Sequence, residues 1–142
     1  MDTNFIVSFL SQHRDIEDEI LTSVQGRLRI IVLDLVVLEL ERLARKASSN
    51  VRSWASVSLD HIRRKNYSIA THRPGPADVD AALISFAVAE TIPTYVATID
   101  RELRTALRSL GVPTLSPKKR HGLIVEGRAS SDLNKGQKGK SL

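Results

Sequence analysis

Residues 94–115, TYVATIDRELRTALRSLGVPTL, contain the pattern that decides the fold. Residues 94–98 are rich in β-branched and aromatic side chains and predict a strand. Residues 101–110 have helical spacing of apolar side chains, and Gly111 followed by Pro113 is typical of a helix end. A second short strand is predicted at residues 112–115. A strand, a helix and a strand in this order indicate two parallel strands joined by a crossover helix.

The same alternation extends toward both ends of the chain. Further helices are predicted at residues 15–24, 35–46, 50–65 and 77–91, and further strands at residues 29–33, 67–71 and 123–125, while residues 4–9 form a short apolar segment. This order predicts an α/β fold, a three-layer α/β/α sandwich around a central, mostly parallel sheet. In such sheets, functional sites gather at the carboxyl ends of the strands.

Composition narrows the class of protein. The chain has no cysteine, which excludes disulfides and thiolate metal sites. No stretch has the pattern of a signal peptide or the length of a membrane span, so we expect a cytoplasmic protein.

Two acidic residues lie on helix faces that otherwise point to the core. Glu39 shares a stripe with Val36 and Leu43, and Asp80 begins the apolar face of the helix predicted at residues 77–91. A carboxylate on such a face is costly unless it is paired or binds a metal. Two ordinary explanations compete: Glu39 reaches water from the edge of its stripe, and Asp80 favours a helix N-terminus. Asp78 is the better N-cap candidate.

Asp100 and Asp2 become candidate site residues only when they are considered together with the other acids. Asp100 lies between a predicted strand and a predicted helix, where a simple N-cap is a strong alternative. Asp2 is almost terminal. A parallel sheet can bring both of them together with Glu39 and Asp80 at one end. Clustered carboxylates repel one another unless a cation neutralises them, and oxygen ligands alone favour Mg²⁺ or Mn²⁺.

At these acids the sequence resembles the PIN-domain family of nucleases. Residues 2–4 (DTN), 36–40 (VVLEL), 80–87 (DAALISFA) and 96–103 (VATIDREL) are similar to four family motifs in the family's order. The resemblance covers residues 1 to about 125. It is strongest to the archaeal branch, akin to PIN nucleases of ribosomal RNA processing, with VapC-type toxins as a second branch.

The resemblance implies a metal-dependent endoribonuclease that hydrolyses phosphodiester bonds of single-stranded RNA. It assigns Asp2, Glu39, Asp80 and Asp100 as the catalytic carboxylates that hold Mg²⁺ or Mn²⁺. A homodimer is expected as well. Further candidates orient the carboxylates (Thr3, Asn4 and Thr98) or bind the RNA backbone (Arg101, Arg104, Lys118, Lys119 and Arg120), and a solvated surface role is an equal alternative for the basic residues.

Two departures from the family pattern matter. A hydrophobic strand usually precedes the first aspartate, whereas only Met1 precedes Asp2 here. We therefore expect this central strand to be missing or much shortened, and the natural start to lie upstream. Ile99 replaces the usual asparagine before Asp100, which removes a polar group that could orient a ligand.

The basic charge is concentrated near the end of the chain. Residues 117–142 contain seven basic and two acidic residues, out of a net charge of +5 for the whole chain. We expect residues 1–126 to form the nuclease domain and residues 127–142 to form a disordered basic tail. Attraction to a polyanion and simple solubilisation are equal explanations for this tail.

Three other functions remain open. A PIN-like scaffold could bind RNA or protein without cleaving it, and a toxin of a toxin–antitoxin pair would use the same chemistry. A nucleotide-binding domain is disfavoured, because no glycine-rich phosphate loop follows a predicted strand.

Overall fold

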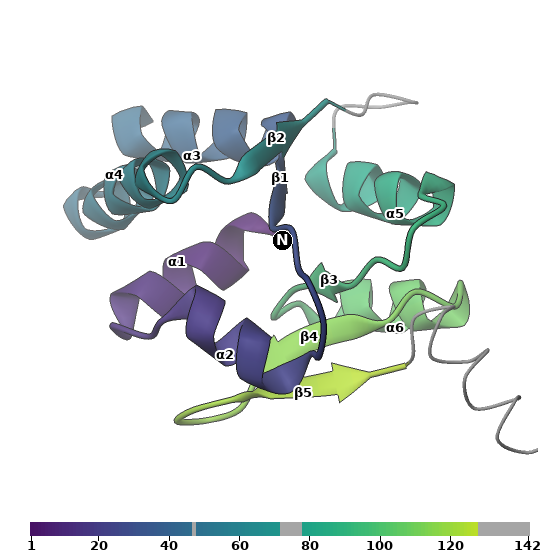
Figure 1. Cartoon of the computed structure of the whole chain (residues 1–142). Helices are drawn as coiled ribbons and strands as arrows, with labels where there is room; N and C mark the ends of the chain where they lie inside the picture. Colours follow the sequence, from purple (N-terminus) through teal and green to yellow (C-terminus); the bar gives the residue numbers. More distant parts are fainter. Residues whose placement is uncertain (47, 72–77, 128–142) are drawn as a thin grey trace, which may run out of the picture.

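The computed structural model describes residues 1–46, 48–71 and 78–127 (Figure 1). The predicted disorder of the tail falls almost entirely outside these residues. The helices are α1 (Thr3–Ser11), α2 (Ile16–Ser23), α3 (Asp34–Lys46), α4 (Ser49–Arg64), α5 (Val79–Ala89) and α6 (Arg101–Ser109). The strands are β1 (Ile31–Leu33), β2 (Ser68–Ala70), β3 (Val96–Ala97), β4 (Thr114–Pro117) and β5 (Leu123–Glu126). Each predicted element is present, and its ends lie within two residues of the prediction.

The strands are mostly parallel, as predicted. β1 pairs with β2 and β3 pairs with β4 in parallel, while β5 runs antiparallel to β4 at the outer edge. Figure 1 shows α1 to α4 gathered in its left half, whereas α5 and α6 lie in its right half. Helices therefore cover both sides of the strands, and the predicted α/β sandwich is confirmed.

The prediction of one central sheet needs correction, because the strands form two separate hydrogen-bonded sheets. Met1 and Asp2 lie between them. The backbone N–H of Asp2 donates to the carbonyl of Ala97 at 3.0 Å, and the amino group of Met1 lies 3.5 Å from the carbonyl oxygen of Ile31. One bond to each side is too few to form a continuous ladder. A largely apolar cavity of about 240 Å³, lined in part by Ile31 and Val96, lies in the gap.

Helix α1 accounts for the apolar segment at residues 4–9. Phe5, Ile6 and Phe9 are fully buried, and the two phenylalanine rings stack with centroids 4.5 Å apart. Their spacing of one and four residues places all three on one helical face. Asp2 begins the helix as its N-cap. The start of the chain is therefore anchored in the core. Within the described residues, no helix combines the length and apolar character needed to cross a membrane.

We predict that Leu107→Ala lowers the free energy of unfolding by about 2–5 kcal/mol, because the substitution leaves a cavity in the core. Leu107 is fully buried on the inner face of α6. Leu21→Ala is the matched control, since Leu21 on α2 is 57% exposed. Urea denaturation of both variants checks this. Equal losses in the two variants would show that α6 does not pack as described.

Candidate active site

Asp2 is the most buried of the four predicted catalytic acids. Its side chain accepts a hydrogen bond from the N–H of Phe5 at 2.8 Å and another from the hydroxyl of Thr98. The residue is 6% exposed. Burial raises the pKa of Asp2 above its ordinary value; the two hydrogen bonds oppose this effect, and the charge of Asp100 adds to it.

Asp100 lies next to Asp2 through a shared partner. The hydroxyl oxygen of Thr98, which donates to Asp2, also accepts the backbone N–H of Asp100 at 3.0 Å. The Oδ1 atom of Asp100 accepts the N–H of Leu103 at 3.1 Å and caps α6. Asp100 is thus an N-cap, as the ordinary alternative predicted, and so is Asp2. In both residues the cap uses one carboxylate oxygen and leaves the second for other contacts.

Asp80 lies in the first turn of α5. Asp78 is the N-cap of this helix, as predicted, and accepts the N–H of Asp80 at 3.2 Å. Asp80 itself is exposed, although Leu83 and Ala87 further along α5 are buried. The prediction that Asp80 lies on the buried face is therefore wrong. Side chains of a helix tilt toward its N-terminus, so an acid in the first turn points past the packed layer.

Glu39 lies in the second turn of α3, between the buried side chains of Val36 and Leu40. It is half-buried, which agrees with a position at the edge of the apolar stripe. Together with Asp78, Asp80 and Arg42, Glu39 lines an open hollow of about 470 Å³ between α3 and the start of α5. Asp78 and Arg42 were not predicted as site residues. Their positions next to Asp80 and one helical turn after Glu39 are the sequence signals that could have found them.

Electrostatic interactions connect all four predicted acids. Partial desolvation raises the pKa of Asp80, and the charges of Asp78, Asp100, Asp2 and Glu39 raise it further. Glu39, Asp80 and Asp100, which follow β1, β2 and β3 along the chain, thus lie close enough for the other two charges to act on Asp80. Even so, no three acidic or histidine side chains in residues 1–46, 48–71 and 78–127 form a group that could hold a metal ion as they stand.

The predicted orienting residues have different surroundings. Thr98 is fully buried and connects Asp2 with Asp100, as an orienting residue should. Thr3 is buried too, and its hydroxyl has no hydrogen-bond partner among the described residues. Asn4 is exposed. Ile99 is 38% exposed, so an apolar side chain occupies a position beside the acids.

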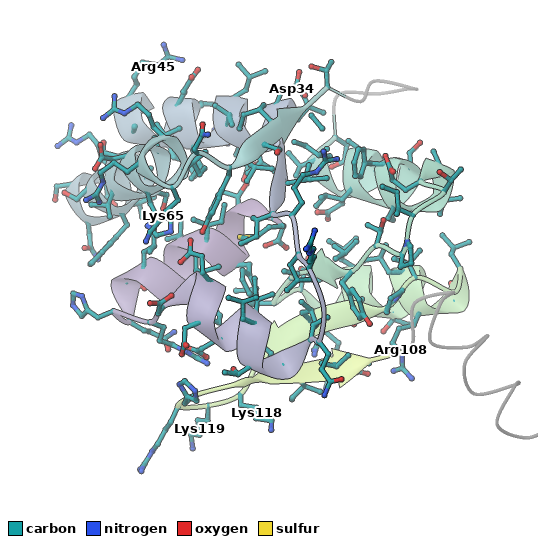
Figure 2. The ribbon with its side chains drawn as sticks, in the orientation of Figure 1. Asp34, Arg45, Lys65, Arg108, Lys118 and Lys119 are labelled. Carbon is teal, nitrogen blue, oxygen red and sulfur yellow. The ribbon has the colours of Figure 1, made fainter. Side chains whose placement is uncertain are left out.

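The predicted RNA-binding residues divide into two groups. Arg104 is half-buried and donates to the Ser116 hydroxyl at 2.9 Å, with Glu126 at 3.5 Å. Its guanidinium is thus already engaged within the protein. The remaining candidates are exposed (Arg101, Lys118, Lys119 and Arg120). Figure 2 shows Lys118 and Lys119 projecting from the end of the molecule that carries the β4–β5 loop.

We predict that Asp80→Asn stabilises the protein in metal-free buffer at pH 7, on the order of 1 °C in Tm because water screens this exposed group. The pKa of Asp80 is raised on folding. Ionised Asp80 therefore destabilises the folded protein, and this loss of stability grows as pH rises from the ordinary pKa of aspartate through the raised pKa. In acid, the stabilisation by Asp80→Asn should disappear. Asp18→Asn is the control: Asp18 lies in the first turn of α2, where its charge is favourable. Thermal denaturation at several pH values checks the opposite signs. A lower Tm for Asp80→Asn at neutral pH would contradict the repulsion.

Comparisons with known proteins bear on the fold and on the family of the chain. The solved structure of the PIN domain endonuclease Utp24 matches with a TM-score of 0.74 and 22% sequence identity, over 90% of each chain. This likeness shows that the two proteins share a fold. A search of curated proteins gives no match. The family model of the PIN like domain matches residues 1–120, which is most of the chain. The chain therefore belongs to the PIN-like domain family.

Proposed function

We propose that this protein is a divalent-metal-dependent endoribonuclease that cleaves single-stranded RNA. One observation carries the proposal: the hydroxyl of Thr98 bonds both the Asp2 carboxylate and the backbone N–H of Asp100, and the charges of Asp2, Asp100 and Glu39 add to the desolvation that raises the pKa of Asp80. Asp100 follows the carboxyl end of β3, where α/β folds build their sites. Membership of the PIN-like domain family and the fold shared with a PIN endonuclease support this function.

The donor set fits a hard divalent cation. All candidate ligands are carboxylate oxygens, which Mg²⁺ and Mn²⁺ prefer, and their mutual repulsion is what such an ion relieves. Asp2 and Asp100 are held in place by hydrogen bonds, whereas no described residue donates a hydrogen bond to the carboxylate of Glu39 or Asp80. We infer that Glu39 and Asp80 would hold a divalent ion together with Asp2 and Asp100, directly or through waters.

Glu39 and Thr98 have different roles in the proposed hydrolysis. A bound divalent ion supplies a lowered pKa for a nearby water and positive charge for the phosphoryl oxygens. Glu39, half-buried at the hollow, is placed to orient the attacking water. Thr98 keeps the Asp2 carboxylate directed toward Asp100 by bonding both residues. In-line attack on phosphorus leaves a 5′-phosphate and a 3′-hydroxyl.

We predict that the purified protein cleaves labelled single-stranded RNA in Mn²⁺ and that a chelator abolishes the cleavage. Glu39→Gln and Asp80→Asn should each lower the rate at least about 100-fold, since each removes one charge from the site without changing its shape. Asp18→Asn should cleave normally. Full activity in both site variants would refute the assignment.

No cleavage by the unaltered protein, together with retained RNA binding, would instead favour the scaffold function. Roles in ribosomal RNA processing or as a toxin, the cytoplasmic location and the homodimer stay predictions.

Arg42 is a further candidate for contact with the substrate. It lines the same hollow as Glu39 and Asp80, and no ion pair joins it to any acid in the described part of the chain. RNA that approaches carboxylates brings its own negative phosphates, so a cation beside the acids offsets the repulsion. We infer that Arg42 holds a phosphate next to the scissile bond.

We predict that Arg42→Ala lowers kcat/KM about 10-fold or more, mainly through a higher KM, because one phosphate contact is lost. Arg45→Ala is the control, since Arg45 is exposed one turn further along α3 and does not line the hollow. Steady-state cleavage of a short RNA at several salt concentrations checks this. If the two substitutions have equal effects, Arg42 contributes only its general positive charge and does not hold a particular phosphate.

A further inference from the structure

The loop between β4 and β5, residues 118–122, ends in a cluster of positive charge. Lys118, Lys119 and Arg120, here called the basic tip, are all exposed, and no acidic side chain in the described ranges pairs with them. The loop closes on itself through the N–H of Lys118, which donates to the carbonyl of Gly122 at 2.9 Å. Gly122 has a φ of +89°, a left-handed conformation that favours glycine.

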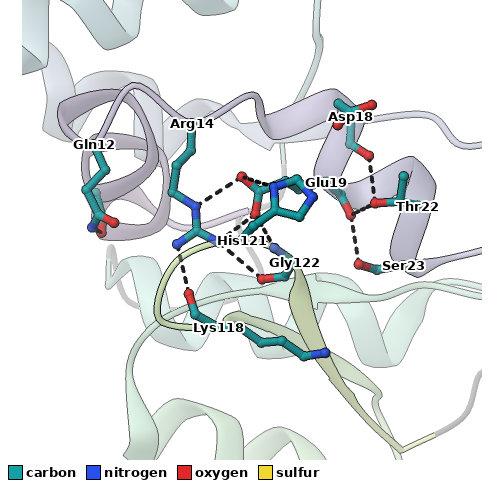
Figure 3. Close-up of polar contacts among 10 residues, drawn as sticks. Gln12, Arg14, Asp18, Glu19, Thr22, Ser23, Lys118, His121 and Gly122 are labelled. Carbon is teal, nitrogen blue, oxygen red and sulfur yellow. Dashed lines mark hydrogen bonds and ion pairs between the residues drawn. The ribbon is translucent and has the colours of Figure 1, made fainter.

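A buried ion pair holds the two ends of this loop (Figure 3). Arg14 donates to both carboxylate oxygens of Glu19, at 3.0 and 2.5 Å. The side chains are only 7% and 2% exposed. Glu19 also accepts the N–H of Gly122 at 2.8 Å, while Arg14 donates to the carbonyls of Lys118 at 2.9 Å and Gly122 at 3.1 Å. The pair, here called the clamp, thus reaches across about a hundred residues to grip loop backbone.

The clamp is a buried ion pair that also contacts the core. The hydrogen bonds from Arg14 are the main reason that the pKa of Glu19 is lowered, and the Arg14 guanidinium also lies 4.4 Å from the ring centroid of the buried Phe9. Burying two charges is costly, so such a pair persists where its geometry satisfies most of its polar atoms. Surface loops are usually the mobile parts of a fold. Here the buried pair fixes one in place.

The basic tip leaves the fold at the same sheet edge as Asp100. β4 lies beside β3 in parallel, with Thr98 N–H donating to the Leu115 carbonyl at 3.0 Å. β3 leads to Asp100, and β4 leads to Lys118, so both lie beyond the carboxyl ends of neighbouring strands. Figure 2 shows Lys118 and Lys119 at the opposite end of the molecule from Arg45.

We propose that the basic tip is a binding surface for the phosphate backbone of single-stranded RNA and that the clamp holds it ready for that contact. The proposal rests on the proposed nuclease function, because RNA held at the tip extends toward the carboxylates. Side chains on a loop that is already ordered lose less conformational entropy when phosphates bind. Each phosphate contact also adds to the salt dependence of affinity.

The first test compares two double variants that remove equal charge. Lys119→Ala with Arg120→Ala removes two tip cations, and Arg45→Ala with Arg52→Ala removes two exposed cations on α3 and α4. Fluorescence anisotropy with a labelled 12-nucleotide RNA, in chelator to prevent cleavage, measures Kd against salt. We expect the tip variant to bind at least 5-fold more weakly and its logarithmic salt slope to fall by about 1.4, or about 0.7 per contact. An unchanged tip variant, or equal losses in both, would overturn the proposal.

The second test separates order from charge. Glu19→Gln removes a negative charge, so simple attraction predicts tighter RNA binding. The clamp predicts weaker binding, although every tip cation is still present. The measurement is made below the unfolding temperature of the variant, which circular dichroism establishes. Tighter binding would show that the clamp does not prepare the tip.

Cleavage distinguishes failure of this proposal from failure of the nuclease function. If the tip binds RNA, its variant should cleave a 12-nucleotide RNA less efficiently and a 4-nucleotide RNA at the unaltered rate, because the shorter RNA does not reach the tip. If the nuclease function fails, no variant cleaves, yet the loss of RNA affinity in the tip variant is still observed. If the tip variant cleaves both RNA lengths at the unaltered rate and binds RNA with normal affinity, the proposed role of the basic tip is overturned and the nuclease function still stands.

Discussion

Two backbone hydrogen bonds at the first two residues connect the halves of this fold. The N–H of Asp2 bonds to Ala97 in one sheet, and the amino group of Met1 contacts Ile31 in the other. No ladder joins the two sheets directly. The same Asp2 begins α1, whose phenylalanines fill the core, and its carboxylate is tied to Thr98 beside Asp100. The relative placement of the acids therefore depends on how this short segment is held.

The candidate site also draws its residues from both halves. Glu39 and Asp80 lie on helices that follow β1 and β2, whereas Asp100 follows β3. Partial desolvation raises the pKa of Asp80 and the charges of these acids raise it further, so folding imposes a cost on the ionised form of Asp80. Proteins accept such costs at functional sites, where local rules are broken in favour of chemistry. Here the cost is moderate, because Asp80 is exposed and water screens much of it.

Local patterns predicted most of the fold, because helical and strand periodicity depend on neighbours in sequence. The positions of Glu39 and Asp80 on apolar faces drew attention to the acids before any contact was known. The same logic placed Asp80 too deep, since periodicity does not say where a packed layer stops. A gap in the sheet between β1 and β3 was anticipated, because the strand that usually precedes the first aspartate is missing or much shortened here. The complete separation into two hydrogen-bonded sheets depends on contacts between distant residues, which no local pattern reports.

The contact between Glu19 and Gly122 is another feature that local sequence patterns do not predict. The two residues are 103 positions apart, and nothing around Glu19 distinguishes it from the acids that simply favour the first turn of α2. Nonlocal pairs of this kind emerge only once the chain has folded. The basic tip, by contrast, is visible as a charge run in the sequence, although its fixed geometry is not.

The manner in which Arg14 and Glu19 grip the β4–β5 loop has a consequence for how this surface can change. Their hydrogen bonds reach only main-chain atoms: the carbonyl of Lys118, which every residue has, and the N–H and carbonyl of Gly122. Of the side chains in between, His121 lies 3.9 Å from a carboxylate oxygen of Glu19, whereas those of Lys119 and Arg120 are not used to hold the loop's ends. New residues at positions 119 and 120 would therefore inherit the same rigid mounting. Selection, or a designer, can retune what this edge of the protein recognises while the architecture beneath it stays intact.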